Sequence, residues 1–330
     1  MRTISELVFH SRKMNFQFTS KSVYWIEFNA QPMKKITFSL SIFLVLVLGL
    51  VSCGPAKTTE ETVVETTDRV GGLALYTLRD SMAINPKTTL KAVADAGYAY
   101  VESADYAEGK FYGMTPAEFK STLDSLGLTA ISAHMGMVTL ENADQLIADV
   151  KAAGISYFVV PIPPMGMFTV DPVTNKLGMK GTADELVTIM NTIGEKCHKA
   201  GLKLLYHNHD FEFMPLADGT IIEDVLLEKC NPEWVNFQMD LYWVTKANAN
   251  ALTYFEKYPG RFKAWHVKDM DQEGKFAPVG TGTIDFKSIL AQKEKSGMEF
   301  YLVEQDQTFG LDPMEAIKIS HKGLVDLGFK

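Results

Sequence analysis

The sequence holds few cysteines and no excess of basic charge. Only three of its 330 residues are cysteine, Cys53, Cys197 and Cys230, so a fold held together by several disulfides is excluded. A single bridge between Cys197 and Cys230 stays open. Asp and Glu number 40 against 32 Lys and Arg, which gives a formal net charge of −8 at pH 7. Binding to nucleic acid requires a basic surface, so this balance argues against such a partner.

A long apolar run covers residues 36–52 and carries no charge. Lys34 and Lys35 precede it, as in a secretory signal. The segment from Leu50 to Cys53 resembles the lipobox of bacterial lipoproteins, in which cleavage precedes the cysteine and the cysteine carries the lipid. We therefore predict a signal peptide over residues 33–52 and an exported protein, anchored through Cys53 in the periplasm or outer membrane of a Gram-negative bacterium. A transmembrane anchor is the alternative, although a bilayer needs about 20 residues.

The other N-terminal residues divide into an extension and a tether. Met33 resembles a natural start, so residues 1–32 are interpreted as an upstream extension. Residues 53–70, rich in Thr and Glu, are predicted to be a flexible tether. Residues 1–52 carry six basic and two acidic side chains, so the mature chain has a formal charge of −12. Residues 71–330 contain no linker and suit one catalytic domain.

Within this domain, short apolar runs alternate with longer amphipathic stretches, which favours a parallel α/β fold. The eight predicted strands are residues 72–76, 99–103, 128–134, 155–161, 202–207, 235–240, 262–267 and 299–304. Gly97, Gly127, Gly154 and Gly201 each stand between a helical stretch and a strand, where glycine tolerates positive φ. A doubly wound sheet is the alternative, but the first turn, residues 77–80, lacks its glycine-rich signature. We predict a single-domain (β/α)8 TIM barrel.

Between the predicted strands, the sequence marks two helix starts and one long loop. Asn85-Pro86 and Thr115-Pro116 each place a capping residue before a proline, as at the first turn of a helix. Residues 162–181 are rich in Pro, Met and Gly and are predicted to be the longest irregular loop. In a barrel such a loop lies at the catalytic face and is able to cover the pocket.

Polar side chains close most of the predicted strands. They are Glu102, His134, His207, His209, Asp240, His266, Lys268 and Glu304. In a TIM barrel these strand ends converge on one mouth, where active sites are built. Asp240, His266 and Glu304 follow three consecutive strands, and His207 completes an arc of four. Two carboxylates and imidazole suit one divalent metal ion, with Mn²⁺ as the first expectation and Co²⁺, Zn²⁺ or Mg²⁺ as alternatives. A hydrogen-bonded network without metal is the competing interpretation.

Several motifs in their order and spacing resemble the xylose-isomerase-like TIM barrel family, also called sugar phosphate isomerase/epimerase. They are YHNHDFEF at 206–213, MD at 239–240, WHVKD at 265–269, PVGTGTIDF at 278–286 and VE at 303–304. The resemblance implies that His207, Asp240, His266 and Glu304 hold the metal. Ketose epimerases of the family have a glutamate where this chain has His207, so only Glu304 remains of their carboxylate pair.

The other polar residues are assigned to catalysis or substrate binding. Glu304, His209 and Lys268 are the candidate catalytic residues. Candidate substrate contacts are Glu102, His134, His209, Glu212 and Lys268. For His209 and Glu212 the alternative is mutual orientation behind the site, and for Lys268 it is a surface position. Trp243, Tyr112 and Phe168 are candidate platforms for a sugar ring, whereas Trp265 is expected in the core.

The expected function is a metal-dependent isomerase or epimerase acting on an unphosphorylated sugar or keto-sugar by proton abstraction next to a carbonyl. Export disfavours a sugar phosphate, and no glycine-rich helix start for a phosphate is evident. A lyase or hydratase acting on a 3-keto-glycoside is the first alternative, which His207 favours. A non-catalytic carbohydrate-binding lipoprotein is the second. The sequence indicates no oligomeric state.

Overall fold

The computed structural model describes residues 69–330, which contain a closed barrel of eight parallel strands. Each strand pairs with its neighbours in chain order, and the last pairs with the first. The strands are β1 (Gly72–Ala74), β2 (Tyr100–Ser103), β5 (Thr129–His134), β6 (Tyr157–Val160), β9 (Lys203–His207), β10 (Val235–Asp240), β11 (Phe262–Val267) and β14 (Phe300–Val303). All eight predicted strands and the predicted fold class are confirmed. The predicted extension, signal peptide and Cys53 lie outside the described residues.

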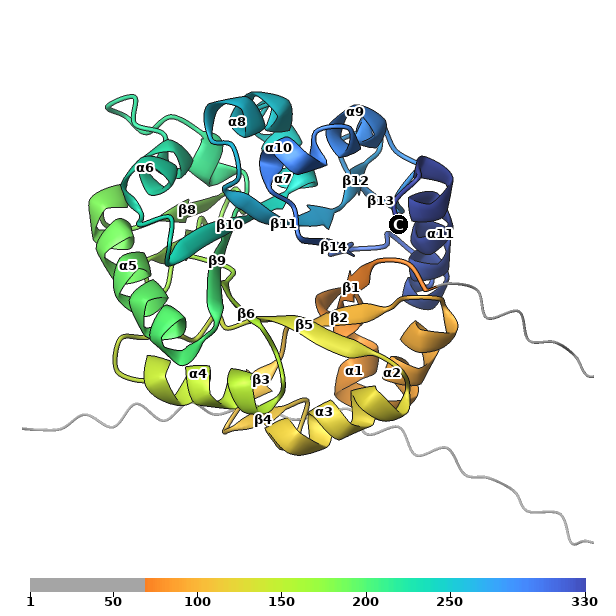
Figure 1. Ribbon diagram of the computed structural model, residues 1–330. Coiled ribbons are helices and arrows are strands. Elements are labelled where there is room, and N and C mark those ends of the chain that lie inside the picture. The colour runs from red at the N-terminus through yellow and green to blue at the C-terminus, as the bar shows by residue number, and fades with distance from the viewer. Residues whose placement is uncertain (1–68) are drawn as a thin grey trace, which may run out of the picture. The chain divides into compact units, whose positions relative to one another are not determined.

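Helices surround the barrel, as Figure 1 shows. They are α1 (Arg79–Ile84), α2 (Pro86–Asp95), α3 (Pro116–Ser125), α4 (Ala143–Ala152), α5 (Ala183–Ala200), α6 (Ile222–Lys229), α7 (Leu241–Lys246), α8 (Ala251–Lys257), α9 (Phe286–Leu290), α10 (Lys293–Ser296) and α11 (Pro313–Leu327), with the 3-10 turns η1 (Leu75–Leu78) and η2 (Phe211–Phe213). Within residues 69–330, no helix has the length and apolar character needed to cross a membrane.

The predicted helix boundaries follow from local chemistry. The Asn85 side chain accepts a hydrogen bond from the Thr88 amide at the start of α2, and Thr115 forms a capping box with Glu118 at the start of α3. Gly97, Gly127, Gly154 and Gly201 all have positive φ, between 63° and 97°. Glycine adopts this conformation without steric cost, so each of the four turns leads from a helix into the next strand.

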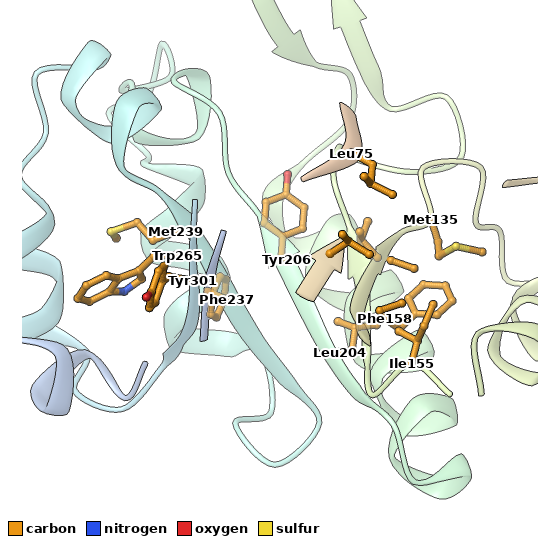
Figure 2. Close-up of a cluster of buried hydrophobic side chains, with 14 of the residues drawn as sticks. Leu75, Met135, Ile155, Phe158, Leu204, Tyr206, Phe237, Met239, Trp265 and Tyr301 are labelled. Atoms are coloured by element: carbon orange, nitrogen blue, oxygen red, sulfur yellow. The ribbon is translucent and has the colours of Figure 1, made fainter. Parts of the chain in front are cut away.

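Strand alternation divides the apolar side chains into two cores. Leu204, Tyr206 and Trp265 point outward and pack beneath the helices, in the larger cluster that Figure 2 shows in part. Leu205 and Ala264, their sequence neighbours, belong to a smaller cluster inside the barrel. The core role expected for Trp265 is confirmed. The same alternation points His207 and His266 inward, because they lie two residues beyond Leu205 and Ala264.

The prediction of an irregular loop over residues 162–181 was wrong. This segment contains an antiparallel hairpin of β7 (Phe168–Val170) and β8 (Leu177–Met179). Asp171 closes the turn by accepting hydrogen bonds from the amides of Val173 and Thr174. Two further short hairpins, β3 (Tyr106–Ala107) with β4 (Lys110–Phe111) and β12 (Asp269–Met270) with β13 (Phe276–Ala277), follow β2 and β11. In the described part of the chain Cys197 and Cys230 are buried and form no disulfide.

The loop that joins β13 to α9 is organised by Asp269. Its carboxylate accepts hydrogen bonds from the backbone amides of Met270, Gly280, Gly282 and Ile284. A Cβ at Gly282 would lie 2.3 Å from the Asp269 carboxylate, so this close approach requires glycine. The glycine pair at 280 and 282 therefore forms a structural turn.

Glu223 of α6 is a carboxylate buried behind the barrel. Neither of its oxygens meets a hydrogen-bond donor within residues 69–330. Burial raises its pKa well above the ordinary value, and Glu212 and Asp224 add to the rise. The folded protein therefore keeps Glu223 neutral at pH values where the unfolded chain ionises it. Stability is lost as the pH rises from the ordinary pKa toward the raised one.

We expect Glu223→Gln to stabilise the protein at pH 7 and to change little at pH 4. The gain grows by up to about 1.4 kcal/mol per pH unit above the ordinary pKa, because the amide does not ionise. Urea unfolding at several pH values measures it. Glu233→Gln, at an exposed position before β10, is the matched control. A gain that does not depend on pH would contradict this explanation.

Candidate metal centre

Four side chains from four neighbouring strands meet at the carboxyl ends of the barrel. His207, Asp240 and His266 end or nearly end β9, β10 and β11, and Glu304 follows β14. One nitrogen or oxygen from each lies within 4.8 Å of all the others, and the four residues are at most 4% exposed. The structure thus brings the four predicted ligands together.

His266 lies among three carboxylates. Its Nδ1 is 2.9 Å from Glu304 Oε2 and 3.9 Å from Asp240 Oδ2, whereas its Nε2 is 2.8 Å from Glu102 Oε1. Burial by itself lowers the pKa of His266, but Glu304 and Glu102 outweigh burial and raise it to about 10. Nδ1 faces the ligands Glu304 and Asp240, and a metal at this place would have to displace the proton that Nδ1 carries.

His207 is oriented by Gln238. Its Nδ1 lies 2.9 Å from Gln238 Oε1, and the Gln238 amide nitrogen donates to Glu102 at 2.7 Å. The amide oxygen only accepts, so Nδ1 carries the proton and Nε2 keeps a free lone pair. Burial lowers the pKa of His207 well below its ordinary value, and His266 and His134 lower it further. His207 is thus a neutral imidazole with one nitrogen available as a ligand.

Asp240 has two oxygens with different surroundings. Oδ1 caps α7 by accepting hydrogen bonds from the amides of Tyr242 and Trp243. Oδ2 is buried and accepts no well-directed hydrogen bond within residues 69–330, although Lys268 Nζ lies 2.9 Å away. A buried carboxylate oxygen without a directed partner suits a cation. With two imidazoles and two carboxylates, the donor set fits one divalent metal ion.

Lys268 lies beside this group and is 1% exposed. Its Nζ is 2.9 Å from Asp240, 2.6 Å from Glu304 and 2.9 Å from Asp306. Burial alone lowers its pKa, but the three carboxylates outweigh it and hold the pKa well above the ordinary value. Lys268 is therefore an ammonium ion, able to donate hydrogen bonds but not to act as a base. The surface position considered for it is excluded.

A cavity of about 670 Å³ opens over the group. Its lining includes His207, Glu304, Lys268, His134 and His209. Burial lowers the pKa of His209 to about 3, so this ring is also neutral. Two of the candidate platforms, Trp243 and Phe168, line the cavity as well, whereas Tyr112 does not.

Glu102 and Glu212 do not reach the cavity, so their prediction as substrate contacts was wrong. Both are fully buried. Glu102 accepts hydrogen bonds from Ser132, Gln238 and His266 and pairs with His134. Glu212 accepts from the Tyr206 hydroxyl and the His209 amide. Glu102 thereby orients the rings of His134 and His266, whereas Glu212 bonds the backbone amide of His209 and not its ring.

Sequence reasoning missed Gln238 and Asp306. Gln238 lies two residues before Asp240 and Asp306 two residues after Glu304, so both share the inward face of a ligand. His134 forms a second group with His207 and His266, but its Nε2 lies 2.9 Å from Glu102 and 3.0 Å from Gln238 Oε1. Strand alternation was the available signal, since it marks every second residue near a ligand.

Fold and site together define a TIM barrel with a candidate metal centre at the carboxyl ends of β9, β10, β11 and β14. The chain belongs to the xylose isomerase-like TIM barrel family, whose model matches residues 90–320. The resemblance seen in the sequence motifs is thereby confirmed.

Individual relatives are more distant. An inosose dehydratase of Lacticaseibacillus casei is 28% identical over 153 residues, which cover 40% of this chain and 49% of the relative. The chain thus spans about half the length of the curated relatives it matches. The structure of a sugar phosphate isomerase/epimerase from Parabacteroides distasonis is 25% identical with a TM-score of 0.66, covering 78% of this chain and 98% of that one. The structure of the IolI protein with a bound zinc atom is 15% identical with a TM-score of 0.60, covering 78% and 97%, and shows the shared fold.

We expect Gln238→Leu to weaken metal binding by about 10–100-fold, the usual effect of removing a residue that orients a metal-bound histidine. The change leaves His207 Nδ1 without its acceptor. Titration calorimetry with Mn²⁺ measures the affinity, and thermal unfolding shows whether the fold is retained. Gln145→Leu, on the exposed face of α4, is the control. An unchanged affinity would show that Gln238 does not orient the ligand.

Proposed function

We propose that this chain is a metal-dependent enzyme that removes a proton next to the carbonyl of an unphosphorylated sugar or keto-sugar. The observation that carries the proposal is the position of Glu304, which belongs to the ligand group and also lines the cavity. His207, Asp240, His266 and Glu304 would hold the ion. When bound, a divalent ion polarises a carbonyl oxygen and so makes the adjacent C–H bond more acidic.

The side chains of this site divide the remaining work. Glu304 has a pKa well below its ordinary value: burial acts against this, but Lys268 and His266 outweigh it. Glu304 is therefore an ionised carboxylate able to accept the proton. The three N–H donors of the Lys268 ammonium face Asp240, Glu304 and Asp306, so Lys268 keeps Glu304 ionised and in position. His209, neutral and at the cavity wall, contacts the substrate hydroxyls.

β-Elimination, in which the proton leaves the carbon next to the carbonyl and an oxygen group leaves the following carbon, fits this geometry best. Epimerisation with two carboxylates requires one on each face of the substrate, and here His207 replaces one of them. In an elimination a single carboxylate suffices: Glu304 takes the proton, a carbon–oxygen bond breaks, and the proton passes to the departing oxygen. The similarity to an inosose dehydratase supports this outcome, since the name of that relative denotes removal of water.

Isomerisation or epimerisation is the second candidate reaction. The similarity to a sugar phosphate isomerase/epimerase over 98% of its chain favours it. His209 would then be the second proton carrier, since it also lines the cavity. The non-catalytic alternative predicts an incomplete ligand group, whereas all four ligands are present and grouped.

An unphosphorylated substrate is supported by the charges around the cavity. Its lining lysine and arginine side chains are Lys268 and Arg79. Lys268 is already paired with three carboxylates, and the Arg79 guanidinium lies over the Tyr76 ring at 4.6 Å. Neither leaves a cluster of free positive charge for a phosphate group.

The test of the reaction is incubation of metal-loaded protein in D₂O with free ketoses and with 3-keto-glucosides, followed by NMR. Elimination gives an unsaturated product and a released alcohol or water. Deuterium at a sugar carbon without release indicates isomerisation or epimerisation. If no deuterium is incorporated and nothing is released from any of these sugars, the proposed proton abstraction is contradicted.

We further propose that the bound ion is Mn²⁺. A mixed set of imidazole and carboxylate ligands suits Mn²⁺, and also Co²⁺ or Zn²⁺, better than it suits Mg²⁺. Elemental analysis of protein purified without a chelator identifies the ion. Protein that neither carries nor rebinds a divalent ion would contradict a metal centre.

Export as a lipoprotein anchored at Cys53 remains a proposal drawn from the sequence. Cys197 and Cys230 are buried, so we expect labelled palmitate to be incorporated at Cys53 alone. Cys53→Ser is expected to abolish labelling and membrane association, whereas Cys197→Ser is expected to change neither. Labelling that persists in Cys53→Ser would contradict the proposal.

A further inference from the structure

The cavity has two chemically different walls. Its polar wall, with His207, His209, Lys268, Glu304 and Asp306, comes from the second half of the barrel. The apolar part of the lining comes from the segments that follow β5 and β6, together with α4. It presents the side chains of Met135, Met137, Leu146, Ile162, Val170 and Leu177. We call this second set the apolar wall.

The apolar wall does not suit a bare sugar. Its six side chains carry no N–H or O–H donor, and a hydroxyl buried against them would lose its hydrogen bonds to water without replacement. The cavity volume of about 670 Å³ lies in the range of sites for drug-sized ligands, larger than a single sugar ring requires. A group that contacts these six side chains is therefore expected to be apolar.

Aromatic rings also line the cavity. Phe168 of β7 lies 6.2 Å from the His209 ring, so it stands at the border with the polar wall, and Tyr106 and Tyr76 line the cavity farther along. Ring faces next to flexible methionines form a surface that accepts planar groups of differing shape. Met137 is 81% exposed and Val170 is 50% exposed, so both side chains are accessible to a ligand that enters the cavity.

We propose that the apolar wall binds an apolar group, preferentially aromatic, carried by the sugar whose carbonyl is held at the metal centre. The substrate class is then a keto-glycoside with an apolar aglycone, rather than a free ketose. The inference rests on the proposed function, because it is the metal centre that fixes the orientation of the sugar. Continuity of both walls within one cavity argues for a single ligand that spans them.

The test compares binding of 4-nitrophenyl and methyl β-D-glucopyranosides to the metal-loaded protein by titration calorimetry. Neither probe has a carbonyl, so no turnover is required. We expect the aryl glucoside to bind about 10–100-fold tighter, from the aromatic area it buries. Equal affinity, or no measurable binding of the aryl glucoside, overturns the inference. A clear aryl preference without any proton abstraction from keto-sugars would instead contradict the proposed function alone.

The double variant Met137→Gln with Val170→Thr tests where the aryl group binds. Both positions are exposed, so the fold should be retained. We expect the aryl affinity to fall about 3–10-fold and the methyl affinity to stay unchanged. Ile84→Gln, an exposed position on α1 that does not line the cavity, is the matched control. An equal loss for both glucosides, or no loss for either, would contradict binding at the apolar wall.

Discussion

Glu304→Gln is expected to lower turnover by about 10²–10⁴-fold, the usual contribution of a general base. The amide is close in size to the carboxylate but takes up no proton at neutral pH. It also leaves Lys268 without the carboxylate that lies 2.6 Å away and His266 without the one at 2.9 Å. Incorporation of solvent deuterium into the sugar, measured by NMR at saturating metal, reports directly on proton abstraction by Glu304.

Saturating metal separates the two roles of Glu304 as ligand and as base. If the variant regains full turnover when more metal is added, Glu304 is a ligand only and the proposed base is wrong. Glu315→Gln, in the exposed first turn of α11, controls for the change of charge. Its turnover is expected to equal that of the unchanged protein.

Asp240→Asn is expected to weaken metal binding by more than about 100-fold, beyond the effect of losing an orienting residue. The substitution tests Oδ2 selectively. Asparagine caps helices about as well as aspartate, so its remaining oxygen can keep the hydrogen bonds from the amides of Tyr242 and Trp243. The other atom becomes an amide nitrogen, which does not coordinate a cation. Titration calorimetry with Mn²⁺ gives the affinity.

The cap of another helix supplies the control for this variant. Asp285 caps α9 through the Ser288 amide and is exposed. Asp285→Asn should leave metal affinity unchanged. If Asp240→Asn binds Mn²⁺ as tightly as the unchanged protein does, Asp240 is not a ligand and its buried oxygen serves the ion pair with Lys268 alone.

Local patterns in the sequence were sufficient to predict the barrel. Residues 235–240 and 262–267 form strands with the predicted bounds, because short runs rich in apolar residues between helical stretches are typical of a parallel α/β fold. The caps at Asn85 and Thr115 are equally local, since each side chain bonds an amide three residues away. Such features depend on neighbours in the chain, so a single sequence contains them.

Predicting the arc of candidate ligands needed one further rule. Parallel strands of a barrel end at one mouth, so polar residues at their carboxyl ends converge. That rule gave His207, Asp240, His266 and Glu304 without any knowledge of how the strands align. It also selected Glu102, which lies at a strand end but points into the network beneath the cavity.

The alignment of the strands was decided only by the tertiary structure. His207 of β9 pairs in register with Gln238 of β10, and Asp240 pairs with His266 of β11. Because of this register, Gln238 lies beside His207. Asp240, two residues farther along β10, lies closer to the mouth of the barrel. Inter-strand register depends on how the whole barrel closes. The sequence by itself therefore determined the barrel and which residues gather at its mouth, whereas barrel closure decided which of them face the cavity and which hold the others in place.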